Sequence, residues 1–576
     1  MATPPNSPPK NIIVGGKKVR LDPSAYVAAG GEASIYSHGG QALRIYHERK
    51  NMPPQARLTE LAKITCPNVV KPIETILDQA TGEEIGFSMA FVTGTEPLCR
   101  FFAQLFRKNN NISPANIAKL VVDIQSTVGQ LIKEGFLPVD LNEMNILPSM
   151  TDYNPWFIDI ASWATPSFKA TAIMESVRDP LVKNNEFTAG STWYSFGVIA
   201  TQLYLGIHPF HGVHPKWKMN WQKRMQENAS IFEAGVKVPS LVPPFSTVPA
   251  SHLDWLKKLF SSSYRGAPPI PGAVAPTPVT PAAARVVYAT GSFMVETVLR
   301  SPAGEIIDVY SYFGRTYAVT TDRVYWVSGE HWTPICDRSK HQQAYVLQGD
   351  SERVVIALVA NRQVSFQVWG ATTKTQSAID PCNTVGGCFV RDGRFYTSNS
   401  GRLLEHSFMF VGPTALRLET HVDNTNDLTV KLLDGMVYQD LLTTAWVTIP
   451  YGKGVSVTTQ IPTLNGWRII DGKARGRFAA LVGVKGGKYQ TFVLRFNEAY
   501  SACTVREIPD QQEINFTVTG ADVCAMIVND DLELFRDPTQ VRGCVNPPVD
   551  QSTKLVHTPQ GTLFLDGTEA RKLIVK

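Results

Sequence analysis

The chain has 576 residues, which is too long for one hydrophobic core, because cores rarely grow past roughly 250 to 300 residues. Its content of 43% hydrophobic and 18% charged residues is typical of a globular protein and excludes a disordered or coiled-coil chain. The formal net charge of +5 is small for this length, so we expect no specific nucleic-acid partner.

The N-terminal residues and the cysteines bear on the cellular compartment in which the protein is found. Residues 1–10 contain four prolines and no apolar run, so we expect a flexible N-terminus over residues 1–19 with neither a signal peptide nor a membrane span. The eight cysteines form no C-x-x-C motif, which favours reduced thiols in a cytoplasmic protein without membrane contact.

Up to residue 265, short strands precede helices. The expected elements are strands at Val27–Tyr36 and Ala42–Tyr46, a helix at Pro54–Ile64, a buried strand at Gly86–Val92, and helices at Asn116–Glu134, Trp193–Leu205 and Leu253–Phe260. This order predicts an α+β domain with a bilobal fold over residues 20–265.

A linker and an all-β domain follow. Residues 266–285 are rich in proline and alanine, with six prolines between Ala267 and Pro281, which predicts an extended linker. Over residues 286–576, paired β-runs recur about every 40 residues, near the length of a four-stranded blade. We expect a β-propeller of six or seven blades, closed by the last strands pairing with the first, and keep a pair of β-sandwiches as the alternative. The ligand of this domain is left open.

One spacing carries chemistry. Asp140 is followed five residues later by Asn145, and Asp159 comes after a short predicted hairpin. An acid, an amide and a second acid in this order are what phosphoryl transfer to a hydroxyl requires. The first acid orients or accepts the hydroxyl proton, while the amide and the second acid hold Mg²⁺ against the phosphates.

Upstream residues supply candidate phosphate contacts. Gly30 and Gly31 fall in a predicted hairpin turn, where backbone amides approach phosphates closely. Arg44 places a cation on the next strand, and Glu60 lies sixteen residues later, at a spacing suited to pairing with it. Without the downstream acids, Arg44 would be read as a surface strand residue.

Together these segments resemble a eukaryotic-type protein kinase of a divergent bacterial or phage-encoded kind. The segments are Gly30–Tyr36, Leu43–His47, Gly86–Met89, Asp140–Asn145, Asp159, Ser176–Pro180, Thr192–Val198 and Gly206–Phe210. The resemblance implies ATP and Mg²⁺ as cofactors, Asp140 as catalytic base, and Asn142 where Ser/Thr kinases carry a lysine. It also implies Asn145 and Asp159 as metal ligands, Met89 and the hinge residue Phe91 near adenine, Glu60 paired with Arg44, and Asp179 paired with Arg265.

Several positions depart from this pattern. The phosphate-binding lysine is Arg44, whose planar guanidinium does not replace an ammonium without shifting its surroundings. Pro138 and Val139 stand before the catalytic acid in place of His and Arg, and Thr192 replaces a helix acid.

Two functions therefore remain open. One is a weakly active ATP-dependent Ser/Thr-type protein kinase acting on a protein substrate. The other is an inactive pseudokinase that serves with the propeller as a structural or scaffold partner, in a host cytoplasm or, if phage-encoded, in a virion. The three nearby histidines His208, His211 and His214 are read as structural and not as a metal site.

Overall fold

The protein is described by a computed structural model covering residues 11–171, 173–270, 293–339, 342–373, 376–442, 444–544 and 549–575. The described residues fall into two compact units. The first contains residues 11–103, 113–238 and 242–270, and the second contains residues 104–112, 239–241 and the chain from residue 293 onward. Contiguous domains with boundaries at 265 and 286 do not describe this division.

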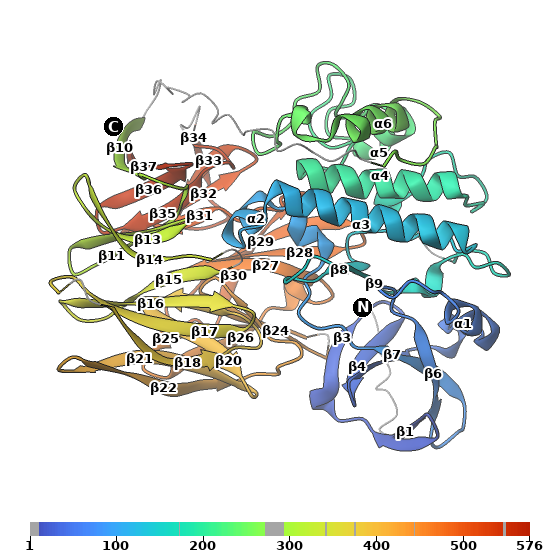
Figure 1. Ribbon diagram of the computed structural model, residues 1–576, viewed down its shortest axis with the longest axis horizontal. Coiled ribbons are helices and arrows are strands. Elements are labelled where there is room, and N and C mark those ends of the chain that lie inside the picture. Colours follow the sequence, from blue (N-terminus) through green and yellow to red (C-terminus); the bar gives the residue numbers. More distant parts are fainter. Residues whose placement is uncertain are drawn as a thin grey trace. The chain divides into compact units, whose positions relative to one another are not determined.

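An antiparallel seven-stranded sheet opens the first unit, with strand order β2-β1-β6-β7-β5-β4-β3 (Figure 1). Its strands are β1 (Asn11–Val14), β2 (Lys17–Arg20), β3 (Tyr26–Ala29), β4 (Ala33–His38), β5 (Gln41–Tyr46), β6 (Pro72–Asp78) and β7 (Glu84–Ala90). The predicted strand Val27–Tyr36 is thus two strands, since the chain turns at the paired glycines.

The hairpin β1–β2 corrects the expectation of a flexible segment to residue 19. Ile12, Val14 and Val19 are buried in one cluster with residues of β4, β5 and β6, and β1 pairs with β6. The alternation of apolar and polar residues in this short stretch stabilises a hairpin on the sheet edge. Residues 1–10 of the predicted segment lie outside the described residues.

The rest of the described first unit contains five α-helices, separated by loops and short 3₁₀ turns. They are α1 (Gln55–Leu61), α3 (Pro114–Lys133), α4 (Ala189–Leu205), α5 (Trp221–Gln226) and α6 (Ala250–Ser261), and a small hairpin joins β8 (Ile146–Pro148) to β9 (Pro155–Phe157). A capping box formed by Ser113 and Asn116 begins α3. The four helices expected from apolar spacing are confirmed. None of the described helices has the length and apolar character needed to cross a membrane.

The second unit is a seven-bladed β-propeller made of seven antiparallel four-stranded sheets. The first four blades are β11 (Ile306–Tyr312), β12 (Arg315–Thr320), β13 (Arg323–Ser328) and β14 (His331–Asp337); β15 (Gln343–Gln348), β16 (Arg353–Ala360), β17 (Gln363–Gly370) and β18 (Gln376–Asn383); β19 (Cys388–Arg391), β20 (Arg394–Asn399), β21 (Arg402–Val411) and β22 (Thr414–Asn424); β23 (Lys431–Leu433), β24 (Met436–Leu441), β25 (Thr444–Gly452) and β26 (Val455–Gln460).

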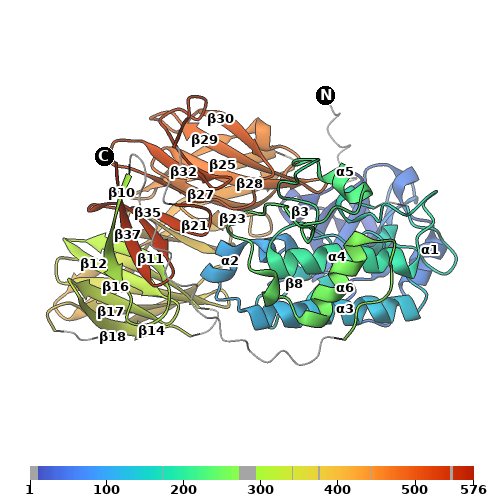
Figure 2. The ribbon, with the colours of Figure 1, turned by 90° about the horizontal axis from the view of Figure 1, so that it is seen from above.

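The last three blades are β27 (Arg468–Arg475), β28 (Phe478–Lys485), β29 (Lys488–Phe496) and β30 (Cys503–Pro509); β31 (Phe516–Val518), β32 (Cys524–Val528), β33 (Asp531–Phe535) and β34 (Arg542–Cys544); β35 (Lys554–Thr558), β36 (Gly561–Asp566), β37 (Glu569–Val575) and β10 (Phe293–Arg300). The first strand β10 pairs with the last strand β37, so the ring closes as predicted (Figure 2). Closure leaves no exposed edge between the first and last blades, and it rules out the sandwich alternative.

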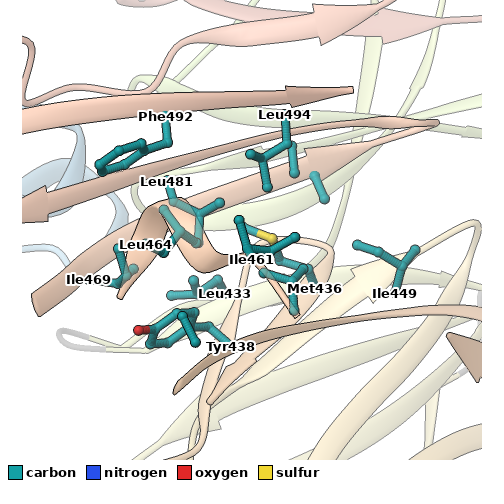
Figure 3. Packing of buried hydrophobic residues seen from close by; sticks show 14 of the residues in the cluster. Leu433, Met436, Tyr438, Ile449, Ile461, Leu464, Ile469, Leu481, Phe492 and Leu494 are labelled. Carbon is teal, nitrogen blue, oxygen red and sulfur yellow. The ribbon is translucent and has the colours of Figure 1, made fainter. Parts of the chain in front are cut away.

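Apolar side chains fill the space between neighbouring blades. Figure 3 shows one such cluster, in which Met436 and Tyr438 of one blade pack with Leu481 and Phe492 of the next, and all four are at most 2% exposed. Burying these side chains contributes roughly 1.5–3 kcal/mol each relative to leaving them in water. The apolar side chains that point from one blade towards the next therefore stabilise each contact between blades.

A short segment from the N-terminal half of the chain belongs to the propeller unit. It spans Gln104–Ile112 and contains α2 (Gln104–Asn109). The backbone N–H of Leu105 donates to Glu513 (3.3 Å), Lys108 pairs with Glu305 (2.9 Å), and the side-chain amide of Gln343 donates to Asn110 (2.8 Å). The three propeller residues lie just before or at the start of β31, β11 and β15. The segment is thereby bonded to three blades.

The predicted linker is described only in its first residues. Trp255 Nε1 donates to the carbonyl of Gly266 (3.0 Å), and the Gln125 amide donates to the carbonyl of Pro269 (3.0 Å). Residues 266–270 therefore pack on α6 and α3 of the first unit. Residues 271–285 lie outside the described residues.

Candidate functional site

The loop between α3 and β8 brings the predicted acid and amides together. Asn145 Nδ2 donates to Asp140 Oδ2 (3.0 Å), and Asn142 Nδ2 donates to the Asp140 carbonyl (3.3 Å). The side-chain oxygen of Asn142 accepts from the Met144 N–H (2.8 Å), which fixes the loop. Asn142 is 1% exposed, so it acts as a support inside this loop and does not reach solvent.

The β8–β9 hairpin carries the chain to Asp159. The N–H of Ile158 donates to the carbonyl of Asn145 (2.9 Å), and this bond places Asp159 beside the loop. Asp159 has a positive φ of 55°, an uncommon conformation for a residue other than glycine. The spacing that the sequence singled out therefore corresponds to one site.

The environment of Asp140 changes its acidity. Burial raises the pKa of this carboxyl above its ordinary value, and the negative charge of Asp159 raises it further. In the opposite direction, the backbone N–H of Met174 donates to Asp140 Oδ1 (2.8 Å). Oδ1 of Asp140 is thus bound to Met174, and Oδ2 is bound to Asn145.

Arg44 forms an ion pair with Asp159. Its Nη1 donates to Asp159 Oδ1, with the Arg44 side chain 11% exposed and that of Asp159 44% exposed. Burial alone would lower the pKa of Arg44, but the neighbouring carboxylate of Asp159 holds it above its ordinary value. The guanidinium also lies 5.1 Å from the ring centroid of Tyr46.

Gly86 allows β7 to approach β5 at this point. A Cβ atom on Gly86 would lie 1.9 Å from the carbonyl oxygen of Arg44, which is closer than any real contact. A larger residue would therefore displace the strand that carries Arg44. This requirement for glycine comes from the close approach of two backbones.

Glu60 does not pair with Arg44, which corrects the expectation drawn from their spacing. Its Oε2 accepts from Thr165 Oγ1 (2.5 Å) and from the N–H of Ser167 (3.2 Å). Hydrogen bonds from Ser167 and Thr165 lower the pKa of Glu60. One turn earlier on α1, the buried Arg57 donates to the carbonyl of Trp163 (2.5 Å). Both charged residues of α1 thus bind the segment that follows Asp159.

The remaining predicted nucleotide contacts lie on the sheet. Gly30 and Gly31 form the turn between β3 and β4, where the Gly30 N–H donates to the Ala33 carbonyl (2.8 Å). A Cβ atom on Gly31 would meet nothing within 4 Å, so the turn is open on that side. Met89, on β7, packs partly buried against the cluster that contains Tyr46, and Phe91 follows that strand.

The pair Asp179–Arg265 forms as the resemblance implied. Arg265 Nε and Nη2 donate to the two carboxylate oxygens of Asp179 (2.6 and 2.8 Å), and Asp179 is 3% exposed. The guanidinium lies 4.6 Å from the ring centroid of Tyr194 on α4. This bidentate pair anchors the segment before α4 to the residues that follow α6.

His208 and His211 are neutral near pH 7, and His208 is buried while His211 is half-buried. Burial lowers the pKa of His208 to about 3 and that of His211 to about 4. His208 Nε2 lies 2.9 Å from the carbonyl oxygen of Ser176. Within the described ranges, no three His, Cys, Asp or Glu side chains are placed to hold a metal ion together.

Two contacts of the site were not predicted. The bond from Met174 to Asp140 has no sequence signal, because every residue except proline carries a backbone N–H. Arg57 could have been noticed as a second charged residue three positions before Glu60, on the same side of a short helix.

Comparisons with known proteins add little. No protein-family model matches the chain, and no curated protein is significantly similar to it. The solved structure of the kinase PK-1 from Cydia pomonella granulovirus is similar with 13% identity and a TM-score of 0.30, over 41% of this chain and 85% of that one. This similarity does not support a phage origin of the chain.

Proposed function

We propose that the first unit is a slow protein kinase that transfers a phosphoryl group from Mg-ATP to a hydroxyl of a protein substrate. The observation that supports this most is the direct bond between Asp140 and Asn145, beside an Asp159 whose charge raises the pKa of Asp140. Phosphoryl transfer needs these three groups in one place.

The residues present fit a magnesium ion. Asn145 uses its amide nitrogen to bind Asp140, which leaves its side-chain oxygen available, and Asp159 is 44% exposed with one oxygen outside the ion pair. Mg²⁺ is usually held by one or two carboxylates together with phosphate and water oxygens. A bound ion would neutralise charge on the phosphates; Asn145 and Asp159 would hold it.

Asp140 is suited to act as the base. A pKa raised by burial brings a carboxyl closer to neutrality and makes it a better proton acceptor. Its Oδ1 must first lose the hydrogen bond from Met174. Arg44 must likewise turn from Asp159 towards the phosphates, and the open turn at Gly31 would offer them backbone N–H groups.

A second candidate is a pseudokinase that acts as a scaffold with the propeller. The observation that favours it is the ion pair between Arg44 and Asp159, because a cation bound to the metal ligand competes with the metal. Since Glu60 is bound to Thr165, it does not draw Arg44 away. Because the Asp159 side chain is 44% exposed, solvent screens this pair, and losing it costs less than the roughly 3–5 kcal/mol of a fully buried pair.

The test measures Mg²⁺-dependent ATP binding and phosphate incorporation on the full chain. The variants are Asp140→Asn and Asp159→Asn, with Asp254→Asn as the matched control because Asp254 is an exposed acid on α6. Incorporation that is lost in both site variants and kept in the control supports a kinase. ATP binding without phosphate incorporation supports the pseudokinase scaffold. If the wild type shows neither ATP binding nor phosphate incorporation, the first unit does not bind nucleotide.

A further inference from the structure

Charged side chains converge near the axis of the propeller. The first strands of neighbouring blades contact one another around this axis, among them β19 with β23, β23 with β27, and β31 and β11 with β35. On or next to four of the seven first strands lies a set of charged residues, here called the axial cluster: Asp308, Asp434, Lys473, Arg475 and Lys554.

Four members of the axial cluster form two ion pairs. Lys554 Nζ lies 3.0 Å from Asp308 Oδ2, and Arg475 Nη2 lies 2.8 Å from each carboxylate oxygen of Asp434. The two pairs join different blades, because Asp308 is on β11 and Lys554 on β35, while Asp434 follows β23 and Arg475 ends β27. Each carboxylate of the cluster is therefore already neutralised.

Lys473 is the fifth member. It is 8% exposed, and among the described residues its ammonium forms no hydrogen bond or ion pair, although the carboxylates of Asp434 and Asp308 act on its charge. Nζ lies 5.4 Å from the ring centroid of Phe516 on the next blade. Lys473 and Asp434 lie opposite each other in a β-bridge between two blades, and the charge of Lys473 helps to lower the pKa of Asp434.

The unpaired cation is costly where it lies. Burial and the positive charge of Arg475 lower the pKa of Lys473 to about 7, and the negative charges of Asp434 and Asp308 oppose this only in part. The cluster has three basic side chains and two carboxylates, so at neutral pH its net charge reaches at most +1, depending on the protonation of Lys473. An ammonium taken out of water without a partner is unfavourable by several kcal/mol, so an anion that reached it would be bound.

Solvent has access to the cluster. The side chains of Asp434 and Arg475 are 46% and 37% exposed, although they belong to the inner strands or their turns. Tyr310 on β11 adds a hydroxyl that has no partner among the described residues. Burial and the nearby charge of Asp308 keep the pKa of Tyr310 well above its ordinary value, so this hydroxyl remains a hydrogen-bond donor.

We propose that the axial cluster is a binding site for a small oxyanion, a phosphate or carboxylate group, held by Lys473 with Arg475 and the Tyr310 hydroxyl beside it. The site holds only one anionic group, because Lys473 is the only cation of the cluster that is not in an ion pair. A second anionic group would be repelled by Asp308 and Asp434. The site lies in the propeller unit and does not depend on phosphoryl transfer by the first unit.

The test uses the full chain and two probes, inorganic phosphate and acetate, with sodium chloride at matched ionic strength. Calorimetry and thermal unfolding follow the wild type, Lys473→Met, and Lys488→Met as a control in which an exposed lysine of the next strand but one is changed. We expect binding in the wild type and control, and a loss of affinity of about tenfold or more in Lys473→Met. The tighter probe identifies the anionic group.

A second variant covers the case in which Lys473→Met fails to fold. Tyr310→Phe removes only the hydroxyl and should weaken binding of the same probe several-fold, with no change of the unfolding temperature in chloride. Equal affinities in the wild type and in both axial variants would overturn the proposal. So would a wild type that binds neither probe at millimolar concentration.

Discussion

The guanidinium of Arg44 pairs with the carboxylate of Asp159, which lies 115 residues further along the chain. Glu60, sixteen positions from Arg44, instead binds Thr165 and Ser167. The cation of β5 is therefore the counter-ion of the residue that would bind a metal. If Mg-ATP binds as proposed, it must exchange this ion pair for new ones.

Arg44→Lys should increase Mg²⁺-dependent ATP binding. A lysine is shorter and makes a single contact in place of a planar fork, so it holds Asp159 less firmly and leaves room for phosphates. We expect a gain on the order of tenfold in binding or in phosphate incorporation. Isothermal titration with Mg-ATP measures it, and Arg49→Lys, at an exposed surface pair with Glu83, serves as the control. Equal binding in all three proteins would show that Arg44 does not restrict the site.

Met174→Pro should raise the pKa of Asp140. Proline has no N–H, so the variant loses the hydrogen bond to Asp140 Oδ1 that favours the charged form. Met174 has φ −71° and ψ 134°, which proline adopts without strain. The pKa follows from carboxyl NMR shifts or from the acid limb of the activity profile. Met174→Ala keeps the N–H and should leave the pKa of Asp140 unchanged; a shift in both variants would assign the effect to the side chain.

Asp179→Ala should destabilise the first unit strongly. It removes the carboxylate of Asp179, which is 3% exposed, and leaves the Arg265 guanidinium beside Tyr194 with backbone carbonyl acceptors only. Removing one partner of a buried pair costs about 3–5 kcal/mol. Denaturant unfolding followed by tryptophan fluorescence measures the loss. Glu83→Gln breaks a pair whose two side chains are 58% exposed and should cost less than about 1 kcal/mol. Similar losses in both variants would mean that burial does not decide the energy.

Glu513→Gln should reduce the pH dependence of propeller stability. Burial raises the pKa of Glu513 from 4.5 to about 7. Because the folded state then holds the proton more tightly, its stabilising effect is complete below pH 4.5 and is lost as the pH rises through about 7. The wild type should thus lose on the order of 1–3 kcal/mol of unfolding free energy across this window, and the variant less.

Denaturant titrations at the two ends of that window test the prediction. Glu507→Gln is the control, since Glu507 is an exposed acid on β30. The control should follow the wild type at both pH values. If Glu513→Gln lost as much unfolding free energy between the two pH values as the wild type, the raised pKa of Glu513 would be refuted.

Local patterns predicted much of this fold. The apolar spacing of Asn116–Glu134 is found as α3, and the 40-residue recurrence of β-runs is found as blades, because both periods are set by the chain itself. The cluster of Asp140 and Asn145 was predicted for the same reason, since five residues in one loop keep the two side chains close.

Partners chosen by tertiary packing were not predictable. Whether Arg44 pairs with Glu60 or with Asp159 depends on how α1 packs against the segment after Asp159. The local pattern of the sequence does not determine this packing. The hairpin Asn11–Arg20 was missed because prolines before it suggested a flexible tail, while its buried face holds only a few apolar residues.

The segment Gln104–Ile112 has a practical consequence for dividing the protein. It precedes the propeller blades by almost two hundred residues in the chain, yet it completes the propeller unit through Glu513, Glu305 and Gln343. No single cut of the polypeptide therefore yields both units whole. In a fragment that starts at residue 286, these three side chains have no partners from the segment Gln104–Ile112. During synthesis, the segment can bind Glu513 only after the chain up to β31 has been made.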